Sequence, residues 1–418
     1  MTTAPGEENS GDERFPHNGA LGIVVLSIEP MELKGTIEWS LPPSKSHMIR
    51  WLALAAQAEG ETSLNFTGSV GEDILSMAGC LRDMGVPIEQ GASKWGVSGV
   101  GSRGLHAPKV VLDCGNSGTA ARCMMAIAAG LSQPVSLDGD QSLRRRDMSA
   151  LVEALRELGC EVTSDTLPLT VTGPIVPVPA HLDVSTSSQP LSALLLASPG
   201  YSGVIHLGTP SHSVSRGYSM LSYELAGLCG SSNKVGSDSA VIEPWRPVTP
   251  GAVEIPDELS LLPLAMLLAE LHGVEVAVTG DGLELSRALM GLAEQTEELD
   301  LRDESDLIAP AAALMALGGG GTIKGAVHAR GKESDRIGST VGLLGCFGSE
   351  ANETEDGIEV AGGQSPVRPT LPVDSHGDHR VAMTAMVLAS KCGGSVDGAE
   401  VCAVSDPDFI EKLMILGD

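Results

Sequence analysis

The stretch "LVEALRELGCEVTSDTLPLTVTG", residues 151–173, decides the class of fold. Its first part spaces apolar residues as a helix does, as far as Gly159, and "LTVTG" (169–173) alternates like a short strand before a second glycine. The same pattern of a helix ending in a glycine recurs near residues 74–99, 220–230 and 341–363, with the first repeats about 70 residues apart. That interval is too long for a solenoid repeat and suits a β/α unit repeated several times. We therefore predict an α/β protein of repeated βαβ-type units.

The bulk composition predicts two to three domains, because 418 residues exceed one ordinary core. The 54 acidic and 26 basic residues give a net charge of −28, which argues against nucleic acid or an anionic membrane as a partner. The most apolar stretch, 259–271, is shorter than the ~20 residues of a membrane span and contains Pro263 and Glu270. We expect a soluble, cytoplasmic protein.

The N-terminal 18 residues are polar and acidic without the apolar segment of a signal peptide, so we expect a disordered tail there. The eight cysteines form no C-x-x-C pair and no metal-ligand spacing. We expect them to be reduced core residues of an intracellular protein.

Five segments begin with small polar residues and continue as helices that are apolar nearly all round: residues 43–58, 114–130, 185–197, 302–317 and 376–389. Helices without a polar face are buried, and a bound anion can satisfy their first N–H groups. The five together predict one site ringed by helix N-termini. The alternative is that Ser46, Thr119 and Ser188 only cap their helices.

The cations beside these turns are Lys45, Arg50, Arg122, Arg146, Lys332, Arg336 and Arg380. Such a set fits a substrate with several carboxylate or phosphate groups. The chain contains no G-x-x-x-x-G-K-[ST] loop, and "GNSGT" (115–119) is not a dinucleotide G-x-G-x-x-G, so we infer no nucleotide.

Acidic residues alternate with these cations. In "GKESDRI" (331–337), Lys332 and Arg336 are four residues apart and would share a helix face, with Glu333 pointing elsewhere. A surface charge ladder is the alternative. Asp306 opens the buried 307–317 segment, either as an N-cap or as a buried general base.

Six segments in this order resemble the signatures of the 5-enolpyruvylshikimate-3-phosphate synthase family: "LPPSKSHMIR" (41–50), "DCGNSGTAAR" (113–122), "LDGDQSLRRRDM" (137–148), "STSSQPLSALLLASP" (185–199), "HARGKESDRI" (328–337) and "GDHRVAM" (377–383). The resemblance implies a two-lobed enolpyruvyl transferase fold, an inside-out α/β barrel of six βαβαββ units. The chain would cross between lobes near Pro42–Pro43 and Ile255–Asp257. One lobe would be residues 44–255 and the other 19–43 plus 256–418, with the active site in the cleft.

The resemblance also implies the reaction. The family transfers the enolpyruvyl group of phosphoenolpyruvate to the 5-hydroxyl of shikimate 3-phosphate by addition and elimination, releasing phosphate, in the shikimate pathway to chorismate and the aromatic amino acids. It uses no metal or organic cofactor. We expect these two small molecules as the partners, and a monomer.

The residues that match the family's binding motifs fall into two sets. For shikimate 3-phosphate, the resemblance implies Lys45, Ser46, Arg50, Ser187, Ser188, Gln189, Ser215, Tyr218, Asp306, His328 and Lys332. For phosphoenolpyruvate, it implies Lys45, Gly118, Arg146, Gln189, Arg336 and Arg380.

The addition needs a base for the 5-hydroxyl and an acid for C3 of phosphoenolpyruvate. Asp306 matches the family's base, and Glu333 and Lys45 are both candidates for the acid. In "SLRRRDM" (142–148), we expect Arg146 to bind the phosphate of phosphoenolpyruvate, with Arg144 as second choice and Arg145 facing solvent.

The sequence departs from the family pattern at several positions. Val404 stands where a lysine is usual, His328 where Asn is usual and Asp147 where Pro is usual. The segment 280–306 is short, which predicts an abbreviated fifth unit. The missing lysine predicts weaker binding of phosphoenolpyruvate or a larger share for Lys45 and Arg146.

Two other functions remain open. A UDP-N-acetylglucosamine enolpyruvyl transferase would have the same fold, but its acid is a loop cysteine, and "GDQSLRRRDM" (139–148) has none. A non-catalytic anion-binding homologue would explain the missing lysine, although Asp306, Glu333 and Lys45 speak against it.

Overall fold

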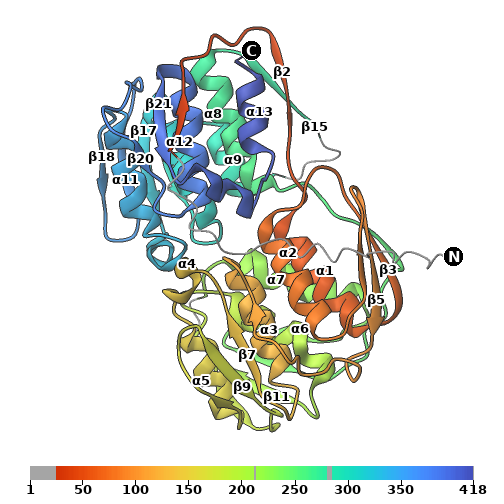
Figure 1. Cartoon of the computed structure of the whole chain (residues 1–418). Helices are drawn as coiled ribbons and strands as arrows, with labels where there is room; N and C mark the ends of the chain where they lie inside the picture. The colour runs from red at the N-terminus through yellow and green to blue at the C-terminus, as the bar shows by residue number, and fades with distance from the viewer. Residues whose placement is uncertain (1–24, 211–212, 280–284, 418) are drawn as a thin grey trace, which may run out of the picture.

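The computed structural model describes residues 25–210, 213–279 and 285–417, which form six small β-sheets with helices packed against them (Figure 1). The expected tail, residues 1–18, lies outside the described residues. No helix in the described ranges is long and apolar enough to cross a membrane.

The stretch 151–173 lies in a complete βαβαββ unit. Its sheet has the order β6-β7-β9-β8, with β6 and β7 parallel and the other pairs antiparallel. The helix predicted to end at Gly159 ends at Glu157, and the strand predicted at 169–173 is β9. The elements of this unit are β6 (Leu112–Asp113), α3 (Gly118–Ala128), β7 (Val135–Asp138), α4 (Gln141–Arg144), α5 (Ser149–Glu157), β8 (Glu161–Val162) and β9 (Leu169–Thr172).

The next unit repeats the order and the strand directions in the sheet β10-β11-β13-β12. Its elements are β10 (Pro179–His181), α6 (Gln189–Ala197), β11 (Ile205–Gly208), α7 (Arg216–Leu228), β12 (Lys234–Val235) and β13 (Ser239–Ile242).

A third unit is completed by a distant strand, since β14 (Ala252–Glu254) runs parallel to β3 (Glu59–Asn65) in the sheet β14-β3-β5-β4. The remaining elements of this unit are α1 (Lys45–Gln57), α2 (Glu72–Asp83), β4 (Ile88–Gln90) and β5 (Lys94–Val100).

The other half of the molecule contains one complete unit, with the sheet β16-β17-β19-β18. Its elements are β16 (Glu298–Asp300), the short helix η3 (Ser305–Leu307), α10 (Ile308–Leu317), β17 (Gly320–Lys324), the short helix η4 (Val327–Gly331), α11 (Arg336–Cys346), β18 (Ala351–Glu353) and β19 (Ile358–Ala361).

The last two sheets of this half have fewer strands in the described residues. One is the three-stranded sheet β1-β21-β20, and the other pairs β2 with β15. Gly280, where the short segment of the fifth unit was predicted to begin, lies outside the described residues. The elements are β1 (Val25–Ile28), β2 (Thr36–Ser40), α8 (Leu262–His272), β15 (Glu275–Thr279), α9 (Arg287–Ala293), β20 (Val373–Asp374), α12 (His379–Cys392), β21 (Gly394–Asp397), the short helix η5 (Ala399–Val404) and α13 (Phe409–Ile415).

Each half of the molecule has its own hydrophobic core. One includes buried residues from Met48 to Ile255, and the other combines Ile28 to Leu41 with Leu261 to Leu413. The helices predicted to be apolar all round lie in these cores: eight of the ten residues of α10 are buried, as are twelve of the fourteen of α12. Six of the eight cysteines are buried, and all eight are unpaired.

The two chain segments that link the halves lie against each other. Pro43 and Asp257 form an isolated antiparallel bridge. The amide of Ser44 donates to the carbonyl of Pro256 at 2.7 Å, and the amide of Glu258 donates to the carbonyl of Pro42 at 2.8 Å. The starts of α1 and α8 are thereby joined at the waist of the molecule.

Candidate active site

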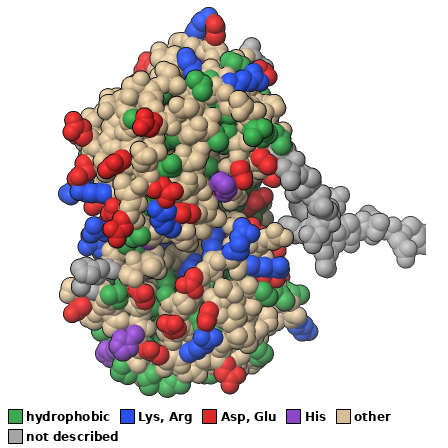
Figure 2. All heavy atoms as spheres, turned by 90° about the vertical axis from the view of Figure 1, so that its left-hand side faces the viewer, with side chains coloured by type: hydrophobic (Ala, Val, Ile, Leu, Met, Phe, Trp, Pro, Cys, Tyr) green, Lys and Arg blue, Asp and Glu red, His purple; other side chains and the backbone are tan. Residues whose placement is uncertain are grey.

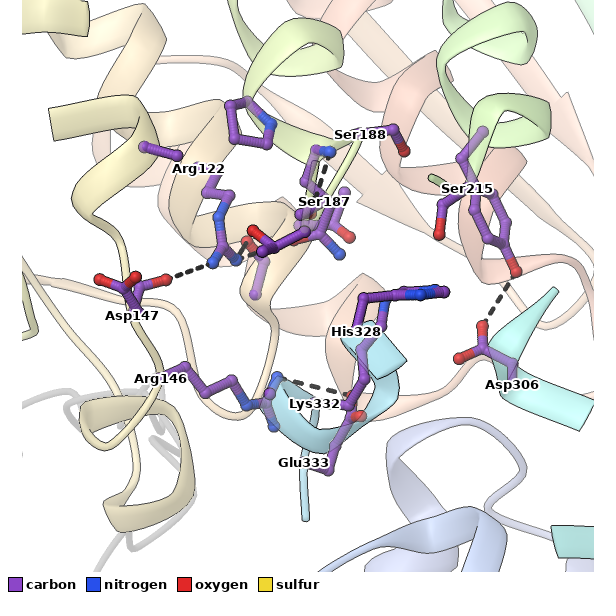
Figure 3. A pocket seen from close by; sticks show the side chains of 18 of the residues that line it. Arg122, Arg146, Asp147, Ser187, Ser188, Ser215, Asp306, His328, Lys332 and Glu333 are labelled. Carbon is purple, nitrogen blue, oxygen red and sulfur yellow. Dashed lines mark hydrogen bonds and ion pairs between the residues drawn. The ribbon is translucent and has the colours of Figure 1, made fainter. Parts of the chain in front are cut away.

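A cavity of about 300 Å³ lies between the two cores and is lined from both halves. Figure 2 shows basic side chains gathered at the waist of the molecule, and Figure 3 shows the cavity from close by. The predicted site residues that line it are Lys45, Ser46, Arg50, Gly118, Arg146, Ser187, Ser188, Gln189, Ser215, Tyr218, Asp306, His328, Lys332, Glu333 and Arg336.

The starts of the buried helices leave several side chains free for the cavity. Ser44 caps α1 and Ser117 caps α3, so the alternative that Ser46 and Thr119 are the caps is wrong. Ser188 occupies the N-cap position of α6 but its side chain makes no cap hydrogen bond. The capping alternative therefore explains none of these three hydroxyls.

Two serine hydroxyls in the cavity lack partners. The Oγ atoms of Ser188 and Ser215 are buried and have no hydrogen-bond partner among the described residues. Ser215 has a left-handed backbone, with φ of 53°, and its amide donates to the carbonyl of Arg302 in the other half at 3.0 Å. Because buried polar groups are nearly always paired, these hydroxyls indicate a site for a ligand with acceptor oxygens.

Arg50 ties α1 to α7. Its Nε donates to Ser222 Oγ at 2.7 Å, and its Nη2 donates to the carbonyl of Tyr218 at 3.0 Å. Burial lowers the pKa of Arg50, although its guanidinium remains cationic at neutral pH. The cavity thus has a rigidly held positive charge on this side.

Lys45 forms an ion pair with Asp73, with 3.0 Å between Nζ and Oδ2. Burial alone would lower the pKa of Lys45, but the negative charges of Asp73 and Glu333 raise it above its ordinary value. Sequence reasoning missed Asp73. Asp73 lies in the first turn of α2, where an acidic side chain stabilises any helix. The sequence around it therefore did not indicate that it would line a cavity.

Arg122 and Gly118 shape the cavity wall beside α3. Arg122 Nη1 donates to Gln189 Oε1 at 2.8 Å, and Nη2 donates to the carbonyl of Asp147 at 2.7 Å. A methyl group on Gly118 would lie 3.0 Å from Arg122 Nη1 and 3.3 Å from Arg146 Nη1. The glycine therefore keeps the space between these two cations open.

Only the third of the successive arginines 144–146 lines the cavity. Arg146 Nη1 lies 3.5 Å from Glu333 Oε1, and Nη2 donates to Asn116 Oδ1. Arg144 pairs with Asp138 outside the cavity, and Arg145 is exposed. Of the three, only Arg146 can reach a ligand in this cavity, and its contact with the phosphate of phosphoenolpyruvate stays a prediction.

Asp306 is not the N-cap of α10. It lies in η3, accepts a hydrogen bond from the hydroxyl of Tyr218 at 2.9 Å and pairs with Arg336. Burial alone would raise the pKa of Asp306, but the charges of Arg336, Arg380 and Lys332 bring it well below its ordinary value. The capping alternative is therefore wrong, and Asp306 is a partly buried carboxylate that lines the cavity.

Arg336 is the centre of a buried charge cluster. It pairs with Asp306, with Glu333, and with Asp378 at 2.8 Å. Lys332 follows η4 and α11 begins at Arg336, so these two cations do not share a helix face as predicted. Residues 332–335 instead form a bend that turns both side chains to the cavity. Glu333, predicted to point elsewhere, joins the same cluster.

Arg380 does not line this cavity. Its guanidinium donates to the carbonyl and the Oγ of Ser260, both at 2.7 Å. The neighbouring His379 does line the cavity. It belongs to the motif "GDHRVAM", but nothing in the sequence indicated a role for it. Burial and the charges of Lys45 and Arg380 hold the pKa of His379 well below its ordinary value. The contact of Arg380 with phosphoenolpyruvate stays a prediction.

No basic residue near the C-terminus takes the place of the missing lysine among the described cavity residues. Val404 is buried in η5, and its carbonyl packs against Gly71. Lys412 Nζ lies 2.6 Å from Asp406 Oδ2 and donates to the carbonyl of Ser40 at 3.0 Å. Across the described ranges, no three His, Cys, Asp or Glu side chains are placed to hold a metal ion.

These observations define a two-lobed α/β protein with a cation-lined cavity between its lobes. The sequence model for EPSP synthase (3-phosphoshikimate 1-carboxyvinyltransferase) matches residues 28–223 and 248–413, and the chain belongs to this family. It has the two-lobed inside-out α/β fold that the resemblance to this family implied.

Curated relatives and solved structures agree with this assignment. The chain is 33% identical to the 3-phosphoshikimate 1-carboxyvinyltransferase of Methanocorpusculum labreanum, over 94% of this chain and 98% of the relative. It is 35% identical to that of Novosphingobium aromaticivorans, over 91% and 96%. The structure of EPSP synthase from Acinetobacter baumannii superposes with a TM-score of 0.75 at 24% identity, over 94% of this chain and 98% of that one.

Proposed function

We propose that this chain is a 3-phosphoshikimate 1-carboxyvinyltransferase, which transfers the enolpyruvyl group of phosphoenolpyruvate to the 5-hydroxyl of shikimate 3-phosphate. The observation that carries the proposal is the enclosure of six cations with the carboxylates of Asp306 and Glu333 in one interlobe cavity. The cavity-lining cations are Lys45, Arg50, Arg122, Arg146, Lys332 and Arg336. They match the two phosphates and two carboxylates of this substrate pair.

Shikimate 3-phosphate binds on the side of α1, α6 and α7. Arg50 and Ser46 take its carboxylate, and the partnerless hydroxyls of Ser188 and Ser215 take its phosphate together with Ser187. Tyr218 packs against the ring. The remaining members of this set are Lys45, Gln189, Asp306, His328 and Lys332.

Phosphoenolpyruvate binds in the space beside Gly118. Arg146 and Lys45 take its phosphate, and Arg336 with Arg380 takes its carboxylate. Gln189, held by Arg122, contacts both substrates. For Arg380 this requires its guanidinium to turn from Ser260 to the substrate.

Asp306 is the base. Its low pKa keeps it as a carboxylate, so it can accept the proton of the 5-hydroxyl while that oxygen attacks C2 of phosphoenolpyruvate. C3 gains a proton at the same time. In the elimination, C3 loses a proton, the C2–O bond to phosphate breaks and the double bond between C2 and C3 is restored.

The acid for C3 is either Lys45 or Glu333. The pKa of Lys45 is raised, so this residue holds a proton in the free protein. Burial raises the pKa of Glu333, but Arg336 and Arg146 bring it well below its ordinary value. When the substrate anions occupy these arginines, the pKa of Glu333 rises, so binding itself prepares this carboxyl to hold a proton.

We further propose that residues 44–255 form one lobe and residues 19–43 with 256–418 the other, and that the lobes close on the substrates. Of the second lobe, residues 19–24 lie outside the described residues. Contacts such as Arg146–Glu333 and Ser215–Arg302 already join the two cores. We propose that the protein acts as a monomer in the cytoplasm.

The assay that tests the reaction measures phosphate release from phosphoenolpyruvate with shikimate 3-phosphate and, separately, with UDP-N-acetylglucosamine. We expect release with the first acceptor alone. Release with UDP-N-acetylglucosamine alone would assign the chain to the cell-wall reaction. Binding of shikimate 3-phosphate without any release would identify a non-catalytic homologue.

A further inference from the structure

His328 presents two partnerless nitrogen atoms in the cavity. It lies in η4, its residue is 6% exposed, and neither Nδ1 nor Nε2 has a hydrogen-bond partner among the described residues. In Figure 3 its ring projects into the cavity that Ser188 and Ser215 also line. A buried imidazole without any hydrogen bond indicates a missing ligand, because such groups are nearly always paired.

The partnerless side chains of Ser188, Ser215 and His328 can all donate a hydrogen bond. The Oγ atoms of Ser188 and Ser215 are hydroxyl donors, and an imidazole donates from one nitrogen when neutral and from both when protonated. A phosphate dianion offers only acceptors, so it can satisfy all of these groups at once. A protonated ring binds the phosphate more strongly than a neutral ring does, because charge-assisted hydrogen bonds are stronger than those between neutral groups.

Burial and the nearby positive charges keep the ring of His328 neutral before a ligand arrives. Burial and the neighbouring Lys332 lower the pKa of His328 to about 4, and Arg336 on α11 acts in the same direction. The carboxylates of Asp306 in η3 and Asp303 in the preceding loop oppose them without prevailing. A dianion placed beside the ring would reverse this balance.

Resting on the proposed function, we infer that His328 is a proton-coupled ligand of the phosphate group of shikimate 3-phosphate. Its ring donates to a phosphoryl oxygen and takes up a proton from solvent as the dianion binds. The asparagine that the family usually has at this position cannot change its charge. This chain therefore binds its acceptor substrate with an uptake of protons that a His328→Asn variant lacks.

The test is isothermal titration calorimetry of shikimate 3-phosphate into the full chain at about pH 6.5, in two buffers of different ionisation enthalpy. The wild type should take up a measurable fraction of a proton more than His328→Asn. Its affinity relative to that variant should also rise as the pH falls from 8.0 to 6.5, by about threefold or more, since affinity follows protonation by linkage. His181→Asn is the control, because it removes an exposed imidazole on β10.

Equal proton uptake by wild type and His328→Asn, with both binding shikimate 3-phosphate, would overturn the inference. A parallel titration with inorganic phosphate, monitored through the His328 ring signals by NMR, separates this inference from the proposed function. A raised pKa of His328 with phosphate, but no turnover of shikimate 3-phosphate, would retain the phosphate ligand and refute the reaction. An unchanged pKa in the phosphate-bound protein would overturn the inference whether or not the enzyme turns over.

Discussion

The guanidinium of Arg146 and the carboxylate of Glu333 form an ion pair across the cavity, with 3.5 Å between Nη1 and Oε1. Arg146 follows α4 and Glu333 precedes α11, so the pair joins the two lobes. Their side chains are 9% and 12% exposed, which shields the pair from water. Any substrate anion that binds Arg146 must compete with Glu333, and this competition links binding to the protonation of the candidate acid.

Arg146→Ala should weaken the binding of phosphoenolpyruvate. Loss of one charge-assisted contact costs about 1.5–3 kcal/mol, so KM for phosphoenolpyruvate should rise about 10- to 100-fold, while binding of shikimate 3-phosphate changes little. Steady-state kinetics against each substrate measure this difference. Arg145→Ala is the matched control, since this neighbouring side chain is exposed and lies outside the cavity. An equal effect of both variants would contradict the assignment.

Val404→Lys tests the departure from the family pattern. Val404 is buried, and the long aliphatic stem of a lysine can cover apolar surface while its ammonium group extends beyond it. We expect KM for phosphoenolpyruvate to fall by about threefold to tenfold, since one added cation contributes on the order of 1 kcal/mol. An unchanged or higher KM in a folded Val404→Lys protein would show that the phosphate needs no further cation here.

Lys412→Met should leave KM for phosphoenolpyruvate unchanged, because its ammonium group is held by Asp406 and the carbonyl of Ser40. The same change should lower the unfolding midpoint, since Asp406 would lose its partner in a buried place. Urea denaturation and steady-state kinetics on one preparation separate the two effects. A raised KM would make Lys412 the substitute for the missing lysine.

Acid should destabilise the fold through two partly buried histidines, His47 and His272. Burial lowers the pKa of His47 and of His272 from 6.5 to about 4 in the folded chain. The unfolded state then binds more protons below pH 6.5, so stability is constant above that pH and falls between pH 6.5 and 4. A fully shielded imidazole contributes at most about 1.4 kcal/mol per pH unit, and the partly buried His272 contributes less.

His272→Gln removes one of these groups at a position where the ring contacts Ser390 Oγ at 3.0 Å, outside the cavity residues. Urea midpoints between pH 7.5 and 5 should fall less steeply in the variant than in the wild type. A slope identical to that of the wild type would remove His272 as a source of acid sensitivity. The depressed pKa values of Asp306 and Glu333 act only below about pH 4.5 and do not contribute in this range.

Asp306→Asn should abolish turnover while preserving the fold and the binding of shikimate 3-phosphate. The amide oxygen can still accept from the Tyr218 hydroxyl, but it cannot take a proton from the substrate. Loss of a general base costs about 10²- to 10⁴-fold in kcat. Calorimetry on the variant provides the control for binding. A kcat near that of the wild type would remove Asp306 as the base.

The repeat and the buried helices could be predicted from sequence because their signals are local. In 151–173 a glycine marks the end of a helix and alternating residues mark a strand, and in α10 nearly every residue is apolar. The choice of Arg146 over Arg144 and Arg145 needed the family pattern as well. Asp73 could not be found, because its contact with Lys45 depends on how α2 packs beside α1. The bend at 332–335 was also missed, since helical spacing of charges does not reveal where a helix begins.

The most direct test of the account follows the phosphorus signals of phosphoenolpyruvate and shikimate 3-phosphate by NMR after the purified chain is added. We expect both signals to decline together while one inorganic phosphate and one new phosphorylated product form for each pair consumed. Persistence of both substrate signals, under conditions where shikimate 3-phosphate binds to the protein, would contradict this expectation.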